Sequence, residues 1–391
     1  MSSNGLPEGE SPLQPDETGS PITLKSPRQR LEPEQAPRAP KRSRHARNPF
    51  VVAANAFFSL IVLTFLAAGA VIYWGSSEYR RPGPLTEPQT VLIPNGLGSN
   101  EIASLLERNG VISSVLVFRL AVQLQNIGDD LKAGEYLFES GSTMNDVVAK
   151  LESGKSIIHK VTLPEGFSSL QIVEVLRNNE LLTGDIEEVP VEGSLLPDTY
   201  TFTRGTQRGR IIEQMKSAQA AAVNRIWSGR VRGLPISTPD ELVTLASIVE
   251  KETGKADERP RVAAVFINRL DRGMKLQSDP TIIYGLFGGA GKPKDRPIYK
   301  SDIEKATPYN TYVIDALPPG PIANPGVAAM EAVANPSTTD ELFFVADGTG
   351  GHAFAKTLDE HNRNVRRWRQ IEAERREAAR KRAAEGEAEQ Q

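Results

Sequence analysis

The hydropathy pattern contains one long apolar stretch, FVVAANAFFSLIVLTFLAAGAVIYW, which runs from Phe50 to Trp74 without a charged residue. A helix of about 20 apolar residues is long enough to cross the hydrocarbon core of a bilayer. A core helix of a soluble protein usually keeps one polar face, and a signal peptide has a shorter apolar region with a small-residue cleavage site. The stretch therefore predicts a single transmembrane helix at residues 50–74.

The residues that flank this stretch predict its orientation. Arg80 and Arg81 follow it closely, whereas a denser basic cluster precedes it: Arg38, Lys41, Arg42, Arg44 and Arg47. Positive charge stays on the cytoplasmic side, so we expect residues 1–49 in the cytoplasm and the remaining chain to be exported. Residues 1–48 have a composition typical of disorder, and residues 75–90 are predicted to be a linker.

A pattern of strand, Pro-x-Gly turn and amphipathic helix occurs twice, at residues 91–112 and 161–182, without gaps at an offset of 70. The identical pairs are Val91/Val161, Pro94/Pro164, Gly96/Gly166, Ser99/Ser169, Ile102/Ile172, Leu106/Leu176 and Asn109/Asn179. Residues 133–155 have a similar pattern, with a helix from Thr143 and a glycine stop at Gly154. Such units resemble LysM-type modules, which bind glycan chains, and a structural α+β spacer is the alternative.

Residues 237–254, STPDELVTLASIVEKETG, predict a helix with both ends marked. Thr238 is expected to be the N-cap, with Pro239 in the first turn and Glu241 completing a capping box. Gly254 is expected to end the helix.

The two acids of the VEKE sequence lie on different sides of this helix in projection. One apolar stripe is formed by Leu242, Leu245, Ala246, Ile248 and Val249. Glu252 falls within the stripe, whereas Glu250 falls far from its centre. We expect Glu250 to be solvated or ion-paired at the margin and Glu252 to point toward the interior.

A carboxyl on an apolar face costs free energy unless it is protonated or paired, and the last turn of a helix also disfavours an anion. Both effects raise the pKa of Glu252, as a general acid at neutral pH requires. The alternative is a structural ion pair with Arg259 or Arg269.

Downstream segments carry further polar and aromatic residues. Residues 273–285, GMKLQSDPTIIYG, predict a short strand and then a helix capped by Asp279. Residues 341–362 predict two strands joined by a GTGG turn, with His352 either contacting ligand or structural. Between them lies a non-helical stretch, suited to a sugar-binding groove or to hairpin packing, with Tyr309, Asn310, Thr311 and Tyr312.

Composition and the absence of certain motifs exclude several kinds of site and enzyme. The 391 residues, enough for two or three folded units, contain no cysteine and four histidines, which excludes disulfides, thiolate metal sites and thiol nucleophiles. No HExxH or GxxxxGK[ST] motif occurs, so neither a zinc protease nor a P-loop nucleotidase is expected. The net charge of −3 argues against a nucleic-acid partner. We expect no metal and no cofactor.

Several motifs, in this order and spacing, resemble the YceG-like endolytic murein transglycosylases: SIVEKETG, NRL–RGM–LQSDPT–YG, YNTY, LPPGPIANPG and FVADGTGGHAF. The match covers roughly residues 90–362 and implies an α+β protein with a LysM-like subdomain at 91–158 and a larger catalytic domain at 159–362. A charged helical or disordered tail is expected at 363–391. The family's catalytic glutamate, the second acid of E-K-E, falls on Glu252, at the end of the predicted buried helix.

The resemblance also implies partners and a location. We expect a protein of the inner membrane with a periplasmic catalytic domain, which cuts peptidoglycan strands, ends their elongation and works with peptidoglycan synthases. Before PDTY, relatives commonly have aromatic residues, whereas this chain has Ser194, Leu195 and Leu196. The candidate substrate-binding residues are Gln277, Ser278, Asp279, Tyr309, Asn310, Thr311, Tyr312 and His352.

The implied chemistry is lytic rather than hydrolytic. Glu252 would protonate the oxygen between N-acetylmuramic acid and N-acetylglucosamine, and would then deprotonate the 6-hydroxyl of the muramic acid, which closes a 1,6-anhydro ring. Hydrolytic glycosidases typically use two carboxylates, and Asp279 is the nearby acid that a muramidase could use. A non-catalytic wall-binding scaffold that recruits synthesis enzymes is the other alternative.

Overall fold

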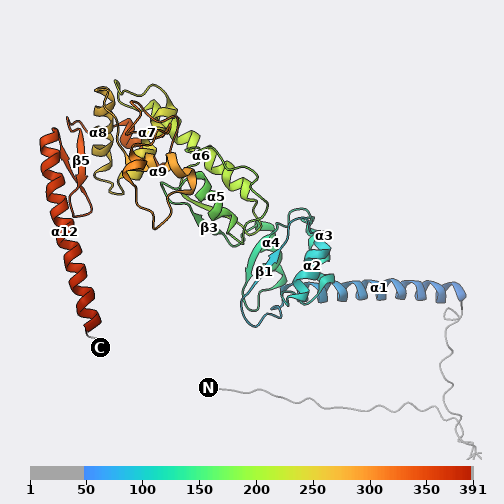
Figure 1. The fold of residues 1–391 in the computed structure, drawn as a ribbon. Helices are drawn as coiled ribbons and strands as arrows, with labels where there is room; N and C mark the ends of the chain where they lie inside the picture. The colour runs from blue at the N-terminus through green and yellow to red at the C-terminus, as the bar shows by residue number, and fades with distance from the viewer. Residues whose placement is uncertain (1–47, 389–391) are drawn as a thin grey trace, which may run out of the picture. The chain divides into compact units, whose positions relative to one another are not determined.

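The computed structural model describes residues 48–388, with side chains described as far as residue 382 (Figure 1). The chain divides into two compact units, Met1–Tyr73 and Trp74–Gln391. Residues 1–47 of the predicted cytoplasmic tail, which include the basic cluster, lie outside the described residues. The described part combines helices with three two-stranded antiparallel sheets, which confirms the mixed α+β class.

The apolar stretch forms most of α1, a single helix that spans Pro49–Arg80. None of its residues is buried. Within residues 48–388, α1 is the helix that is long and apolar enough to cross a membrane, judged by length and composition.

The prediction of a linker at residues 75–90 is wrong for much of this segment. α1 continues past Trp74 to Arg80, and Tyr79 packs against the hydrophobic core of the module that follows. The Gly83 N–H then donates to the Ser142 carbonyl at 3.2 Å. Tertiary contacts order this segment, and its polar composition gave no sign of them.

The first repeat is an α+β module with its own hydrophobic core. Thr143 caps its last helix in a capping box, and Gly154 ends that helix with φ of 67°, as predicted. Two strands pair antiparallel and the helices pack on them. The elements are β1 (Gln89–Ile93), α2 (Ser99–Arg108), α3 (Val115–Gln125), β2 (Gly134–Phe138) and α4 (Met144–Ser153).

The second repeat has a similar architecture and a separate core, but its described residues include no helix in the place of α3. Its elements are β3 (His159–Thr162), α5 (Ser169–Arg177), β4 (Thr199–Phe202) and α6 (Arg208–Ser228). Val91 faces Tyr136 in one sheet, and Val161 faces Tyr200 in the other. Each tyrosine hydroxyl donates to the carbonyl four residues earlier, at 2.7 and 2.8 Å. The duplication therefore includes β2–α4 and β4–α6, beyond the part visible in the sequence.

An ion-paired cluster joins the two repeats. Arg204 donates to Glu135 at 3.0 Å, and His159 Nε2 lies 2.6 Å from the other carboxylate oxygen. Burial alone would raise the pKa of Glu135, but the hydrogen bonds from His159 and Arg204 outweigh it and lower the pKa. The second repeat, which begins here, lies within the range predicted for the catalytic domain.

A third hydrophobic core is mainly helical. Its central helix is α7 (Pro239–Glu252), which contacts α6 and the surrounding helices α8 (Arg259–Asp271), α9 (Asp279–Phe287) and α11 (Val327–Ala334). The GTGG turn joins β5 (Phe343–Ala346) to β6 (His352–Ala355), as predicted. The remaining elements are η2 (Gly288–Ala290), α10 (Lys300–Ile303) and the C-terminal α12 (Leu358–Ala388).

Local predictions around α7 and α9 need correction. The Thr238 capping box is confirmed, but α7 ends at Glu252 with an extended Thr253 as C-cap, and Gly254 does not end it. Residues 274–278 form no strand. Asp279 is the first residue of α9 rather than its cap, because Ser278 occupies the N-cap position.

Candidate active site

Glu252 is the last residue of α7, and its carboxyl meets the segment that precedes α9. Its Oε1 accepts a hydrogen bond from the Ser278 hydroxyl at 2.5 Å. Arg259 pairs with other carboxylates, and Arg269 donates to backbone carbonyl oxygens. Within the described residues no ion pair includes Glu252, so the structural ion pair considered as an alternative does not form.

Several neighbours act on the pKa of Glu252. Burial raises this pKa and is the largest effect, and the charge of Asp279 raises it further. The hydrogen bond from Ser278 and the charges of His352 and Arg269 lower the pKa without cancelling the increase. A carboxyl that stays protonated closer to neutral pH is suited to donate a proton.

Thr311 fixes the segment that carries Ser278. The Ser278 N–H donates to Thr311 Oγ1 at 2.9 Å, and the Gln277 N–H donates to the Thr311 carbonyl at 3.2 Å. Thr281 Oγ1 lies 2.9 Å from Thr311 Oγ1. Gln277 has φ of 53°, which is uncommon for a residue other than glycine. This buried network aims the Ser278 hydroxyl at Glu252.

The residues on either side of Thr311 have different surroundings. Asn310 is buried, and its amide donates to three backbone carbonyl oxygens at 2.7, 3.0 and 3.4 Å, so it supports the segment. The Tyr312 hydroxyl donates to Asp279 Oδ1 at 2.7 Å. Burial raises the pKa of Tyr312. Ser278, Asp279 and Tyr312 are therefore the predicted residues that surround Glu252.

His352 begins β6 and is held by Glu258. Its Nδ1 lies 2.7 Å from Glu258 Oε2, and its backbone N–H donates to Oε1 at 3.1 Å. Burial alone would raise the pKa of Glu258, but the two hydrogen bonds with His352 lower it. The rings of Phe344 and Phe354 pack around the imidazole. His352 thus has a structural partner, and its charge acts on Glu252 from the margin of the site.

The Glu250 side chain is more buried than predicted. It forms the expected ion pair, with Arg259 at 3.7 Å, but its side chain is only 6% exposed. It also accepts a hydrogen bond from the Gly326 N–H at 3.1 Å, and burial raises its pKa. The turn of the second repeat around Gly166 and the start of α11 cover this side of α7, which the projection of an isolated helix treats as open.

A further carboxyl, partly buried and missed by the sequence analysis, lies beside two tyrosines. Glu192 accepts hydrogen bonds from the Ser169 N–H at 2.7 Å, the Asn324 amide at 3.0 Å and the Tyr284 hydroxyl at 3.3 Å. Burial raises its pKa. Glu192 and Tyr284 line a cavity of about 820 Å³ together with Tyr309, whose ring lies 4.8 Å from that of Tyr284.

Residues 194–196, where the resemblance implies aromatic residues in relatives, lie next to this cavity or in the adjoining cores. Ser194 lines the cavity. Leu195 and Leu196 are buried in the second and third cores. The two leucines therefore contribute packing, and neither faces the cavity as a stacking surface.

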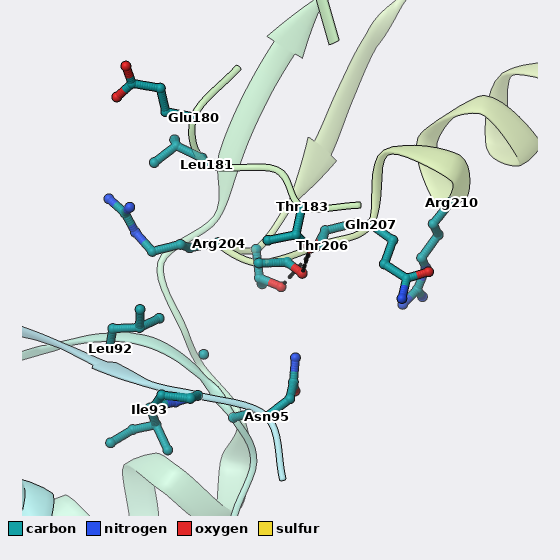
Figure 2. Close-up of a pocket in the computed structure, with 15 residues that line it drawn as sticks. Leu92, Ile93, Asn95, Glu180, Leu181, Thr183, Arg204, Thr206, Gln207 and Arg210 are labelled. Carbon is teal, nitrogen blue, oxygen red and sulfur yellow. Dashed lines mark hydrogen bonds between the residues drawn. The ribbon is translucent and has the colours of Figure 1, made fainter. Parts of the chain in front are cut away.

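A second cavity, of about 730 Å³, lies between the two repeats (Figure 2). Figure 2 shows Asn95 of the first repeat pointing toward Gln207 and Arg210 of the second. Arg210 forms no ion pair within the described residues. The lining also contains the charged Glu180 and Arg204, together with threonine and aliphatic side chains such as Leu92, Leu181, Thr183, Thr203 and Thr206.

Comparisons with known proteins give a consistent result. The YceG-like family matches residues 91–367. An endolytic murein transglycosylase of Bacillus subtilis is 33% identical over 303 residues, which is 69% of this chain and 82% of the relative. An endolytic murein transglycosylase of Streptococcus pneumoniae is 30% identical over 321 residues, which is 71% of this chain and 57% of the relative.

Among solved structures, a YceG-like protein from Listeria monocytogenes is 31% identical. The alignment covers 71% of this chain and 99% of that protein, with a TM-score of 0.43. The family matches most of the sequence, and the bacillar relative passes 30% identity over most of its own length. The chain belongs to the YceG-like family.

Proposed function

We propose that this chain is an endolytic lytic transglycosylase that cuts the β-1,4 bond between N-acetylmuramic acid and N-acetylglucosamine inside peptidoglycan strands. The observation that carries the proposal is the carboxyl of Glu252, which has a raised pKa, no ion pair within the described residues and one orienting hydroxyl. The names of the bacillar and pneumococcal relatives support the substrate and the reaction. Acting on growing strands beside peptidoglycan synthases, the enzyme ends their elongation.

In this mechanism one carboxyl serves two steps. Protonated Glu252 gives its proton to the bridging oxygen as the bond to the muramic acid C1 breaks. The resulting carboxylate takes the proton of the muramic acid 6-hydroxyl, whose oxygen bonds to C1 and closes the 1,6-anhydro ring. Glu252 is thereby protonated again, and no water is consumed. The Ser278 hydroxyl keeps the carboxyl oriented in both protonation states.

The products distinguish this chemistry from hydrolysis. We expect mass spectrometry of purified glycan strands treated with the enzyme to show 1,6-anhydro ends, since the 6-hydroxyl replaces water. Asp279→Asn should keep these products, because Asp279 is bound to Tyr312 and acts on Glu252 through its charge. Without that charge the pKa of Glu252 falls, so the loss of activity on the alkaline side should begin at lower pH. Reducing ends would identify a muramidase, and intact strands would indicate a scaffold.

The proposed location is the inner membrane, with α1 as a single span and the catalytic region in the periplasm. The support is the apolar helix α1 and the basic cluster at residues 38–47. We expect protease added to spheroplasts to digest the chain after α1 and to leave residues 1–49 protected. Protection of the large region instead would reverse the topology.

The repeats are proposed to bind the same strand as a LysM-like glycan site, with the cavity between them as the contact. Amide and hydroxyl groups beside aliphatic side chains suit a sugar. Asn95→Ala with Gln207→Ala should weaken co-sedimentation with purified sacculi. Asn145→Ala, an exposed asparagine on α4, is the matched control. Unchanged binding would favour a structural spacer. Point changes are preferable to deleting residues 91–155, which would remove Glu135 from its pairs with His159 and Arg204.

A further inference from the structure

The helix α3 of the first repeat exposes a stripe of leucines. Leu116, Leu120 and Leu124 are 57%, 47% and 85% exposed, and their spacing of four residues places them on one face. The opposite face carries the buried Phe118 and Val122, and Val117, at the edge of the stripe, is also buried. A row of large apolar side chains on the surface marks a contact with another molecule or with lipid.

Both ends of α3 are attached to the last turns of α1. The hydroxyl of Ser113, just before α3, donates to Glu78 at 2.6 Å. The amide of Gln125, the last residue of α3, donates to the Tyr79 hydroxyl at 3.1 Å. All four residues belong to the compact unit Trp74–Gln391, so these contacts fix α3 beside residues 78 and 79.

This attachment places α3 close to the end of the apolar stretch. Glu78 and Tyr79 follow Trp74 by four and five residues in a continuous helix, which corresponds to about 6–8 Å of helical rise. The polar layer on each side of a bilayer is about 5–8 Å thick. The ends of α3 are therefore bound to residues at the depth of the lipid headgroups.

We propose that α3 lies in the headgroup layer of the bilayer that α1 crosses, with Leu116, Leu120 and Leu124 at the boundary with the acyl chains. Arg119 and Gln123 are exposed beside the stripe, as in interfacial helices whose basic side chains reach the lipid phosphates. Lipid is the molecule that contacts the leucine stripe, because the hydrogen bonds to Glu78 and Tyr79 hold α3 beside the bilayer before any protein partner arrives. This inference rests on α1 as the proposed membrane span.

The absence of native cysteine allows a direct test with the full-length chain. Single variants Leu120→Cys, Val191→Cys and Leu63→Cys are labelled with an environment-sensitive dye and inserted into vesicles of phosphatidylethanolamine and phosphatidylglycerol. Val191 is the control for an exposed aliphatic residue elsewhere, at 79% exposure. Leu63 lies in the apolar part of α1 and reports the span itself. Circular dichroism checks that each variant is folded.

We expect brominated lipids to quench the label at position 120 several-fold more than the label at 191, and aqueous iodide to show the reverse order. Quenching by iodide at 120 with lipid quenching at 63 would overturn the inference and leave the span intact. Self-quenching between labelled chains at 120, without lipid quenching, would identify a second copy as the occupant and would also overturn it. Absence of lipid quenching at 63 would show that the proposed span itself fails.

Discussion

Glu252→Gln is expected to reduce cleavage of purified glycan strands by at least about 10²–10⁴-fold, the range associated with removing general acid–base catalysis. Glutamine keeps the size of the side chain and can still accept the hydrogen bond from Ser278, but it cannot donate a proton as an acid. The melting temperature should change little, because no ion pair of the described residues is lost. Product release is measured by mass spectrometry and unfolding by circular dichroism.

Glu250→Gln is the matched control two residues earlier on the same helix. Glutamine can still accept the hydrogen bond from the Gly326 N–H, so most of the activity should remain even though the pair with Arg259 is lost. Equal loss of activity in both variants would assign the effect to the end of α7 rather than to the Glu252 carboxyl. Unfolding of Glu252→Gln would make Glu252 a structural residue and refute the mechanism.

The position of Glu252 could be predicted because it depends on short-range geometry. The Thr238 capping box sets where α7 begins, and the helical period then places Glu252 on the apolar side. The same projection failed for the environment of Glu250, since the turn around Gly166 comes from another part of the chain. A projection includes only the helix itself, so it cannot show which other segments cover each side.

The partners of Glu252 and the carboxyl of Glu192 depend on contacts between distant segments. Ser278 is aimed by Thr311, 33 positions away, and this contact also explains why Ser278 rather than Asp279 precedes α9 as its N-cap. Glu192 is bound by Asn324, which lies 132 positions downstream. Neither pair has a local sequence pattern that would indicate it.

The duplication was visible only in part for a related reason. The first halves of the repeats align at an offset of 70, whereas Tyr136 and Tyr200 show that the second halves are offset by 64. The capping pair Thr143 and Asp146 of α4 is also replaced at the start of α6, where Gln207 forms no side-chain cap. The connection between the two halves is shorter in the second repeat, and the side-chain cap of the last helix is absent there. These two differences hid the second half of the repeat in the sequence, although its strand pairing is the same.

Arg259→Met is expected to lower the free energy of unfolding by about 3 kcal/mol, the lower end of the range for removing one partner of a buried ion pair. Arg259 is buried between Glu250 at 3.7 Å and Glu165 at 3.9 Å, and these distances exceed those of hydrogen-bonded pairs. The variant leaves the Glu250 side chain, which is 6% exposed, without the cation of its ion pair. Urea unfolding of the full-length chain in detergent measures the change.

Two comparisons separate the buried carboxylate from other effects of Arg259→Met. Arg225→Met removes an exposed pair with Glu331 that is shorter, at 3.0 Å, yet it should cost at most about 1 kcal/mol because solvent screens it. Adding Glu250→Gln to Arg259→Met should restore part of the stability, since no charge is then left buried. In Arg259→Met the pKa of Glu250 in the folded state rises further above its value in the unfolded state. The stability loss should therefore grow as the pH rises from the unfolded-state pKa to the folded-state pKa. Equal losses for Arg225→Met and Arg259→Met, independent of pH, would show that the pair of Glu250 and Arg259 contributes no more than a surface contact.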